Sequence, residues 1–132
     1  MCSFLITNIL IKYIEDLISL NKKLNYKLKL RGPDRTIIKK IRDITLIHNL
    51  LHITGVKTIQ PFLNKDETII CVFNGEIYNY KKLEKMFKKT YKSDGECLID
   101  LYLNYGETFT KYIHGEFAIV LIDLNKNKIV IS

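Results

Sequence analysis

The sequence predicts an α+β fold in which helices cover a largely antiparallel sheet. A short apolar run of strand length opens the chain at residues 2–7, and a helix-periodic stretch follows at 9–30. Strand-like apolar runs then recur at 45–54, 68–73 and 117–123, with helical stretches grouped before the last of them. Elements that are grouped in this way, rather than strictly alternating, favour α+β over a parallel α/β sheet.

Length and composition predict a single domain without a membrane span. The chain has 132 residues, of which 47% are hydrophobic and 27% charged, and this balance argues against disorder. No run approaches the roughly 20 apolar residues that a membrane helix needs. Residues 4–11 are apolar but lack a basic leader and a small-residue cleavage site, so we expect no signal peptide and a cytoplasmic protein.

The formal net charge of +7 raises the possibility of a nucleic-acid partner. Guanidinium groups, the better readers of phosphates and bases, are few; they belong to Arg31, Arg35 and Arg42. Lysines are scattered, except for a group that we interpret as the solvated face of one helix, namely Lys81, Lys82, Lys85, Lys88, Lys89 and Lys92. We therefore expect no nucleic-acid partner, and the basic-module hypothesis stays open only if these lysines form one contiguous face.

The first half of the chain predicts a helix and two further strands after the opening one. Apolar positions at helical spacing indicate a helix over residues 9–30, which the Gly-Pro pair of the turn at 31–34 ends. Residues 36–41 predict a short strand. Residues 45–54 carry apolar and β-branched side chains on both faces, which predicts a strand buried on both sides and broken at Gly55.

The second half predicts strands joined by turns and short helices. Ser93 or Asp94 suits the N-cap of a helix running to about residue 105. The other expected elements are strands at 68–73, 117–123 and 128–131 and helices at 80–90 and 107–113.

The stretch Asn74-Gly75 follows a buried strand and precedes a Lys-rich helical stretch. We expect the strand to break into the helix here. A glycine lets the backbone approach a ligand with its N–H free, and the asparagine amide adds donors beside it. Hydrogen-bond donors that converge at a strand end can form an oxyanion hole. An ordinary turn is the alternative reading of the same pair.

The three cysteines indicate neither a disulfide framework nor a zinc site, because their number is odd and none forms a CxxC pair. Cys71 and Cys97 are interpreted as small buried hydrophobes. Cys2 becomes the N-terminal residue if Met1 is removed. Its own α-amino group, with an ordinary pKa of about 7.7–8, could then act as general base for the thiol; a chance cysteine near a frayed terminus is the alternative. We expect no metal, since His48 and His52 lack a third ligand nearby.

Six short blocks occur in one order along the chain and together resemble the N-terminal glutaminase domain of class II glutamine amidotransferases, most of all that of glutamine-dependent asparagine synthetases. The resemblance extends from Cys2 to about Asp123. The blocks are Met1-Cys2-Ser3-Phe4, Arg31-Gly32-Pro33-Asp34, Gln60-Pro61-Phe62, Phe73-Asn74-Gly75-Glu76-Ile77-Tyr78-Asn79, Ser93-Asp94-Gly95-Glu96 and Gly115-Glu116-Phe117-Ala118.

The resemblance implies an N-terminal-nucleophile hydrolase fold, an αββα sandwich of two antiparallel sheets between helix layers. It implies that Cys2 attacks the side-chain amide of L-glutamine while the Asn74 side chain and the Gly75 N–H hold the oxyanion. Asp94 would receive the substrate α-amino group, and Glu76 would lie in the same pocket. No cofactor is implied.

The chain also departs from the family. The family normally carries an Arg, which would clamp the glutamine α-carboxylate, where this chain has Leu50 in the substrate-binding segment Leu50-Leu51-His52-Ile53. Protonated His52, two residues on, could share Leu50's strand face and replace that Arg in part. Ile6 stands where relatives commonly carry a small Gly and could crowd the nucleophile.

From these observations we expect residues 1–132 to be a glutaminase domain, shortened at its C-terminal end and without a synthetase domain, since no Ser-Gly-Gly loop is present. One hypothesis is a glutamine amidohydrolase that passes ammonia to a separate ATP-dependent synthetase chain for asparagine synthesis. The alternative is an inactive amidotransferase-like domain that binds or regulates a partner, and Leu50 favours it.

Overall fold

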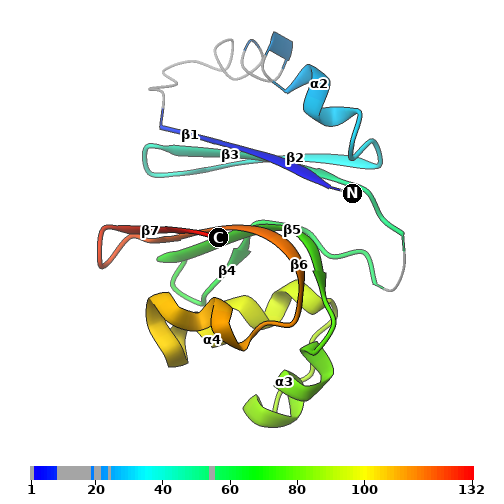
Figure 1. Cartoon of the computed structure of the whole chain (residues 1–132). Coiled ribbons are helices and arrows are strands. Elements are labelled where there is room, and N and C mark those ends of the chain that lie inside the picture. The colour runs from blue at the N-terminus through cyan, green and yellow to red at the C-terminus, as the bar shows by residue number, and fades with distance from the viewer. Residues whose placement is uncertain (1, 9–18, 20–21, 24, 54–55) are drawn as a thin grey trace. The chain divides into compact units, whose positions relative to one another are not determined.

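A computed structural model describes residues 2–8, 19, 22–23, 25–53 and 56–132 (Figure 1). The chain divides into two compact units, Met1–Ile53 and Thr54–Ser132, and each is described by itself. Both units contain antiparallel sheets and helices, which confirms the predicted α+β class. Among the described residues no helix is long and apolar enough to cross a membrane.

The first unit is built on a three-stranded antiparallel sheet of order β1-β3-β2. Its strands are β1 (Ser3–Thr7), β2 (Arg35–Ile41) and β3 (Ile44–Leu50). The central strand β3 is buried over its last six residues, as its apolar pattern on both faces predicts. The register pairs Ser3 with Asn49 on one side and Arg35 with Leu50 on the other.

Most of the helix expected at residues 9–30 lies outside the described residues. Its C-terminal end is α2 (Tyr26–Lys29), after which the Arg31 and Gly32 N–H groups bond back to Leu28 and Lys29. The stop predicted at Gly32 is confirmed, although the physical reason is close packing. An added Cβ at Gly32 would lie 2.1 Å from the Asn49 carbonyl oxygen, so only glycine lets this turn press onto β3.

A buried amide cluster ties α2 to the sheet. The side chains of Asn25 and Asn49 are fully buried and exchange two hydrogen bonds, of 2.7 and 3.0 Å. Asn49 also bonds the hydroxyls of Ser3 and Thr36, at 3.2 and 3.0 Å. Ser3 donates in turn to the Leu28 carbonyl at 2.7 Å. Because every amide atom has a partner, the cluster fixes the sheet face that α2 covers.

The second unit is built on a four-stranded antiparallel sheet of order β4-β5-β6-β7. Its strands are β4 (Phe62–Leu63), β5 (Ile69–Ile77), β6 (Gly115–Asp123) and β7 (Lys128–Ile131). The strand expected at residues 68–73 does not break at Asn74-Gly75, so that prediction is wrong. β5 continues to Ile77 because β6 pairs with it along its whole length. Tertiary pairing thus overrides the local Asn-Gly turn signal.

Short helices cover one side of this sheet, as Figure 1 shows for α3 and α4. They are α3 (Tyr80–Phe87), η1 (Asp94–Glu96), α4 (Cys97–Tyr105) and η2 (Gly106–Tyr112). Their apolar side chains pack on alternate residues of β5, which include Cys71, Phe73 and Ile77. The helix α3 ends at Phe87, earlier than predicted, because Lys88 adopts a left-handed conformation.

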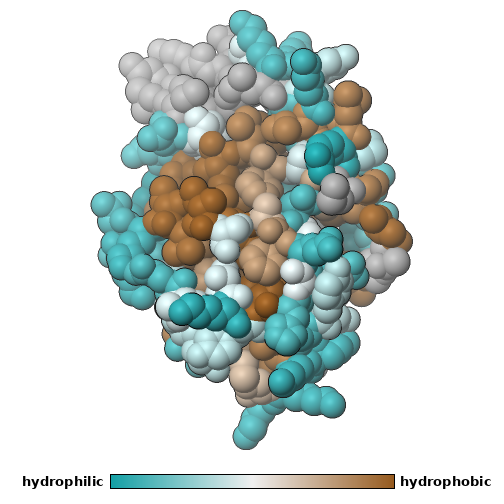
Figure 2. Space-filling view, in the orientation of Figure 1, coloured by the Kyte–Doolittle hydropathy of each residue, from teal (hydrophilic) through white to brown (hydrophobic). Residues whose placement is uncertain are grey.

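The lysines after Tyr80 lie on an exposed face of α3 and of the loop that follows it. Figure 2 shows hydrophilic side chains over the end of the molecule where Figure 1 places α3. Two of these lysines pair with carboxylates: Lys81 with Glu84 at 3.0 Å and Lys89 with Asp100 at 2.5 Å. Such pairing fits a solvated face better than a phosphate-binding one.

Candidate active site

The Cys2 side chain lies against the end of β3. Its Sγ is 3.4 Å from the Leu51 nitrogen and 3.7 Å from the Leu51 oxygen. The Leu51 N–H donates to the sulfur, so a thiolate at this position would keep a backbone donor. The side chain is half-buried, which suits a nucleophile that must meet a substrate.

The segment after β3 differs from the extended strand that its sequence predicts. β3 ends at Leu50, so the expectation that His52 shares a strand face with Leu50 is wrong. The reason is that Asp34 takes the next backbone donor: the His52 N–H donates to Asp34 Oδ2 at 2.6 Å. Leu50 is buried and Leu51 half-buried. His52 and Ile53 are exposed.

Ile6 does not crowd the thiol within this unit. It pairs with Leu46 in the β1–β3 ladder. Four residues of extended strand span about 13 Å, so its side chain lies well away from Cys2.

Asn74 and Glu76 lie near the C-terminal end of β5, on the sheet face that the helices do not cover. Phe73 and Ile77 alternate with them and join the core on the helix side. Asn74 is half-buried, whereas Gly75 and Glu76 are exposed. The Asn74 amide is therefore free to reach a ligand on that face.

The free edge of β5 holds a backbone donor between two occupied ones. The Phe73 N–H donates to Gln60 Oε1 at 2.7 Å, and Gln60 Nε2 donates back to the Phe73 carbonyl at 2.9 Å. Four residues on, the Ile77 N–H donates to Asp94 Oδ2 at 2.8 Å. Backbone donors of alternate residues in an antiparallel strand point the same way. The Gly75 N–H therefore points away from β6, and among the described residues it has no acceptor.

The close approach of the β5 and β6 backbones requires a glycine at position 75. Its φ is +152°, and an added Cβ would lie 2.0 Å from the Glu116 carbonyl oxygen. Gly115 meets the same constraint across the ladder, where its Cβ would lie 2.0 Å from the Glu76 carbonyl oxygen. Two glycines thus let β5 and β6 approach closely beside the candidate oxyanion donor.

Asp94 links the short helix η1 to the end of β5. Besides accepting from Ile77, its carboxylate accepts from the Gly95 backbone. Burial raises the pKa of Asp94, and these backbone donors offset the rise in part. The position of η1 is set by Gly95, whose added Cβ would lie 2.6 Å from the rings of both Phe62 and Phe73. Ser93, the other expected cap, makes no side-chain capping bond.

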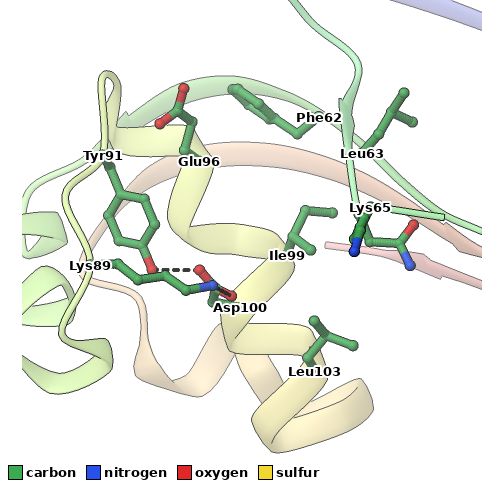
Figure 3. A pocket seen from close by; sticks show the side chains of 10 residues that line it. Phe62, Leu63, Lys65, Lys89, Tyr91, Glu96, Ile99, Asp100 and Leu103 are labelled. Carbon is green, nitrogen blue, oxygen red and sulfur yellow. Dashed lines mark hydrogen bonds and ion pairs between the residues drawn. The ribbon is translucent and has the colours of Figure 1, made fainter. Parts of the chain in front are cut away.

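Side chains also anchor the loop that leads into η1. Tyr91 donates its hydroxyl to Asp100 at 2.7 Å, and its N–H donates to Glu84 at 2.8 Å. Figure 3 shows the Tyr91 hydroxyl and the Lys89 ammonium meeting at Asp100. These groups line a hollow of about 500 Å³ beside Phe62 and α4, and none of the predicted site residues lines it. The Tyr91 hydrogen bonds thereby anchor the loop that leads to Asp94.

The remaining cysteines behave as expected, and no metal site is formed by the described residues. Cys71 and Cys97 are fully buried. Burial raises the pKa of both thiols, that of Cys97 to about 12, so neither is a nucleophile at neutral pH. Among the described residues no group of three His, Cys, Asp or Glu side chains could hold a metal ion.

Comparison with known proteins decides the family. A family model for a glutamine amidotransferase domain matches residues 1–132. The chain belongs to the glutamine amidotransferase family. It is 37% identical over 124 residues to a probable glutamine-hydrolyzing asparagine synthetase of Dictyostelium discoideum, covering 86% of this chain and 22% of that protein.

Two further relatives are also asparagine synthetases. An asparagine synthetase of Oryza sativa subsp. japonica is 38% identical over 105 residues, covering 76% of this chain and 18% of that protein. A probable asparagine synthetase of Schizosaccharomyces pombe is 38% identical over 113 residues, covering 81% and 20%. The chain is thus a glutamine amidotransferase domain of the asparagine synthetase type, and it spans about a fifth of the length of these relatives.

Within this amidotransferase domain, the predicted site residues divide between the two units. Cys2 and the segment from Leu50 to Ile53 belong to the first, and they meet at the end of β3. Asn74, Gly75, Glu76 and Asp94 belong to the second, where they meet at the end of β5. Gln60 was missed as a site residue. The Gln-Pro-Phe block marks its place, but the block does not reveal that its amide occupies the strand edge beside Gly75.

Proposed function

We propose that the domain hydrolyses the side-chain amide of L-glutamine, with Cys2 as nucleophile. The observation that carries the proposal is the Gly75 N–H on the free edge of β5. It has no acceptor among the described residues, and it lies between backbone donors that are bonded to Gln60 and Asp94. Beside it, the Asn74 side chain adds an amide donor. Two preorganised donors are what a tetrahedral oxyanion needs.

The reaction follows from the two groups that Cys2 carries once Met1 is removed. The α-amino group accepts the thiol proton, and the thiolate attacks the amide carbon of glutamine. Asn74 and Gly75 hold the resulting oxyanion. The C–N bond then breaks, and the α-ammonium group gives its proton to the departing ammonia. Water attacks the thioester, its proton passes to the α-amino group, and glutamate leaves with the thiol restored.

Asp94 and the residues around it would bind the rest of the substrate. A carboxylate at Asp94 is complementary to the glutamine α-ammonium group, and Glu76 would lie in the same pocket. The segment Leu50-Leu51-His52-Ile53 would also contribute to substrate binding. No cofactor is needed for any of these steps.

We further propose that the chain has the αββα fold of N-terminal-nucleophile hydrolases. An antiparallel sheet with helical structure on one face, present in each unit, supports this proposal. Ammonia released from glutamine would serve asparagine synthesis by an ATP-dependent synthetase on another chain, in the cytoplasm. Such a role involves no nucleic acid and no membrane.

The deciding experiment is glutamate release from L-glutamine by the purified chain with Met1 removed. We expect Cys2→Ala to abolish it while Cys71→Val, a substitution in the buried part of β5, leaves it within about twofold. Activity that survives Cys2→Ala would exclude this mechanism.

An inactive domain that binds or regulates a partner is the second candidate. It is favoured by Leu50, a buried apolar side chain where the family's Arg is expected. Replacing Leu50→Arg distinguishes the two by calorimetry: a sound pocket would bind glutamine more tightly, whereas an unchanged absence of binding would support the inactive alternative.

A further inference from the structure

Cys2, Leu50 and Arg35 form one row across the sheet of the first unit. Arg35 pairs directly with Leu50 in the β2–β3 ladder. On the other side of β3, Ser3 pairs with Asn49, and the same register continued by one residue sets Cys2 opposite Leu50. Directly opposed residues of an antiparallel pair lie on the same face. The thiol and the guanidinium therefore flank Leu50 on one sheet face.

This face is the one that α2 leaves uncovered. Ser3 and Asn49 point toward α2, where they join the buried amide cluster. Because successive strand residues point to opposite faces, the row through Leu50 points away from α2. At the end of this face Arg35 is exposed and Cys2 half-buried, whereas Leu50 between them is buried.

The backbone of Arg35 is held firmly. The Asp34 N–H donates to the Leu50 carbonyl at 3.0 Å, and Asp34 Oδ2 accepts from the His52 N–H at 2.6 Å. The turn before it is pressed onto β3 at Gly32. A side chain that starts from so fixed a position is suited to binding a ligand.

The charge of Arg35 is not neutralised by the surrounding protein. Its side chain is exposed, and within the described ranges no carboxylate pairs with it. The other positions of this face along the three strands are apolar or basic, namely Phe4, Ile6, Ile37, Lys39, Ile41, Ile44, Leu46, His48 and Leu50. A guanidinium at the end of an apolar face is well placed to bind a carboxylate through two parallel hydrogen bonds.

The spacing suits glutamine. Neighbouring strands lie about 4.8 Å apart, so the Cα atoms of Cys2 and Arg35 are separated by about 10 Å. Four bonds join the reacting amide carbon of glutamine to its α-carboxylate carbon, which is about 5 Å when extended. A long arginine side chain can close the remaining distance.

We propose that Arg35 binds the α-carboxylate of glutamine in place of the Arg that Leu50 replaces. This inference rests on the proposed glutaminase function and assigns the cation to the neighbouring strand. Leu50 then forms the apolar floor between nucleophile and guanidinium.

The test compares ammonia release from L-glutamine with that from its α-amide, which lacks the carboxylate. We expect Arg35→Gln to raise the KM for glutamine by about 10- to 100-fold, the loss typical of a charge-assisted hydrogen-bonded pair. The KM for the α-amide should change by less than about twofold. The matched control is Lys39→Gln, a cation on the same face about 13 Å along β2, which should leave both values unchanged.

A second variant makes the assignment sharper. Adding Leu50→Arg to Arg35→Gln should restore the low KM for glutamine, because it places a guanidinium beside the lost one. If wild-type protein hydrolyses glutamine and Arg35→Gln leaves its KM unchanged, the role of Arg35 is overturned while the glutaminase function stands. If wild-type protein neither hydrolyses nor binds glutamine, both fall.

Discussion

The Asp94 carboxylate bonds the Ile77 backbone N–H at 2.8 Å, two residues beyond Gly75 on β5. One side chain thereby closes the strand edge next to the candidate oxyanion donor and presents a negative charge beside it. Asp94 therefore does more than cap the short helix η1, because its hydrogen bond to Ile77 joins residues 17 positions apart in the chain.

Replacing Asp94→Asn should separate the charge of this residue from its structural bond. The asparagine carbonyl can still accept from Ile77, so we expect the Tm to fall by no more than about 3 °C. The KM for glutamine should rise by about 10- to 100-fold, because the partner of the α-ammonium group loses its charge. Asp66→Asn, in the exposed turn before β5, is the control and should change neither value.

The pH dependence of glutamine binding should report the environment of Asp94. Burial raises the pKa of this carboxyl above its ordinary value. Protonated Asp94 cannot pair with an ammonium group, so the KM should rise as the pH falls through that raised pKa. This rise should begin at a higher pH than an ordinary aspartate would give. A KM profile that is the same in wild type and Asp94→Asn would contradict the assignment.

Replacing Gly75→Ala should be more damaging than replacing another glycine of positive φ. The added Cβ would meet the Glu116 carbonyl at 2.0 Å, whereas at Gly106, with φ +60°, nothing lies within 4 Å. Gly106→Ala should therefore lose only backbone strain energy, about 1–3 kcal/mol. Gly75→Ala must also push β6 away, and we expect about 2 kcal/mol more, measured by urea unfolding. Equal losses would mean that the close approach is unimportant.

His48 should make folding sensitive to acid. It is fully buried, and among the described residues neither ring nitrogen has a hydrogen-bond partner. Burial lowers its pKa from 6.5 to about 4, so the unfolded chain binds the proton more readily than the folded one. Stability should fall by about 3 kcal/mol as the pH drops from 6.5 to 4. His48→Leu should remove this component of the pH dependence, whereas the exposed His114→Gln should keep it.

Apart from the two-residue strand β4 (Phe62–Leu63), which falls in a segment without a strand signal, the strands and their order along the chain could be predicted, whereas their ends could not. Residues 36–41 and 128–131 are strands as predicted, since runs of apolar and β-branched residues carry their own signal. The end of β3 depends on Asp34, which is 18 residues away from His52. The course of β5 through Gly75 depends on pairing with β6. Neither partner can be recognised from local spacing.

In the candidate site, too, some features could be predicted from the sequence and others depend on tertiary contacts. Six ordered blocks predict the glutamine amidotransferase family, which the family comparison confirms. The sequence also shows that Leu50 stands where the family carries an Arg. The cation expected to replace that Arg was His52, two residues along the same strand. The register places Arg35 beside Leu50 instead. A neighbour across a sheet cannot be read from one strand alone.

By itself, the sequence determined the α+β class, the family, and the residue types available for chemistry, because hydropathy patterns and ordered motifs are local properties of the chain. Tertiary structure alone decided that the Gly75 N–H, without an acceptor in the described part of the chain, lies between Gln60 and Asp94, and that Arg35 pairs with Leu50. Both relationships join residues distant in sequence, and they arise from strand register and close backbone packing, which only the folded chain establishes.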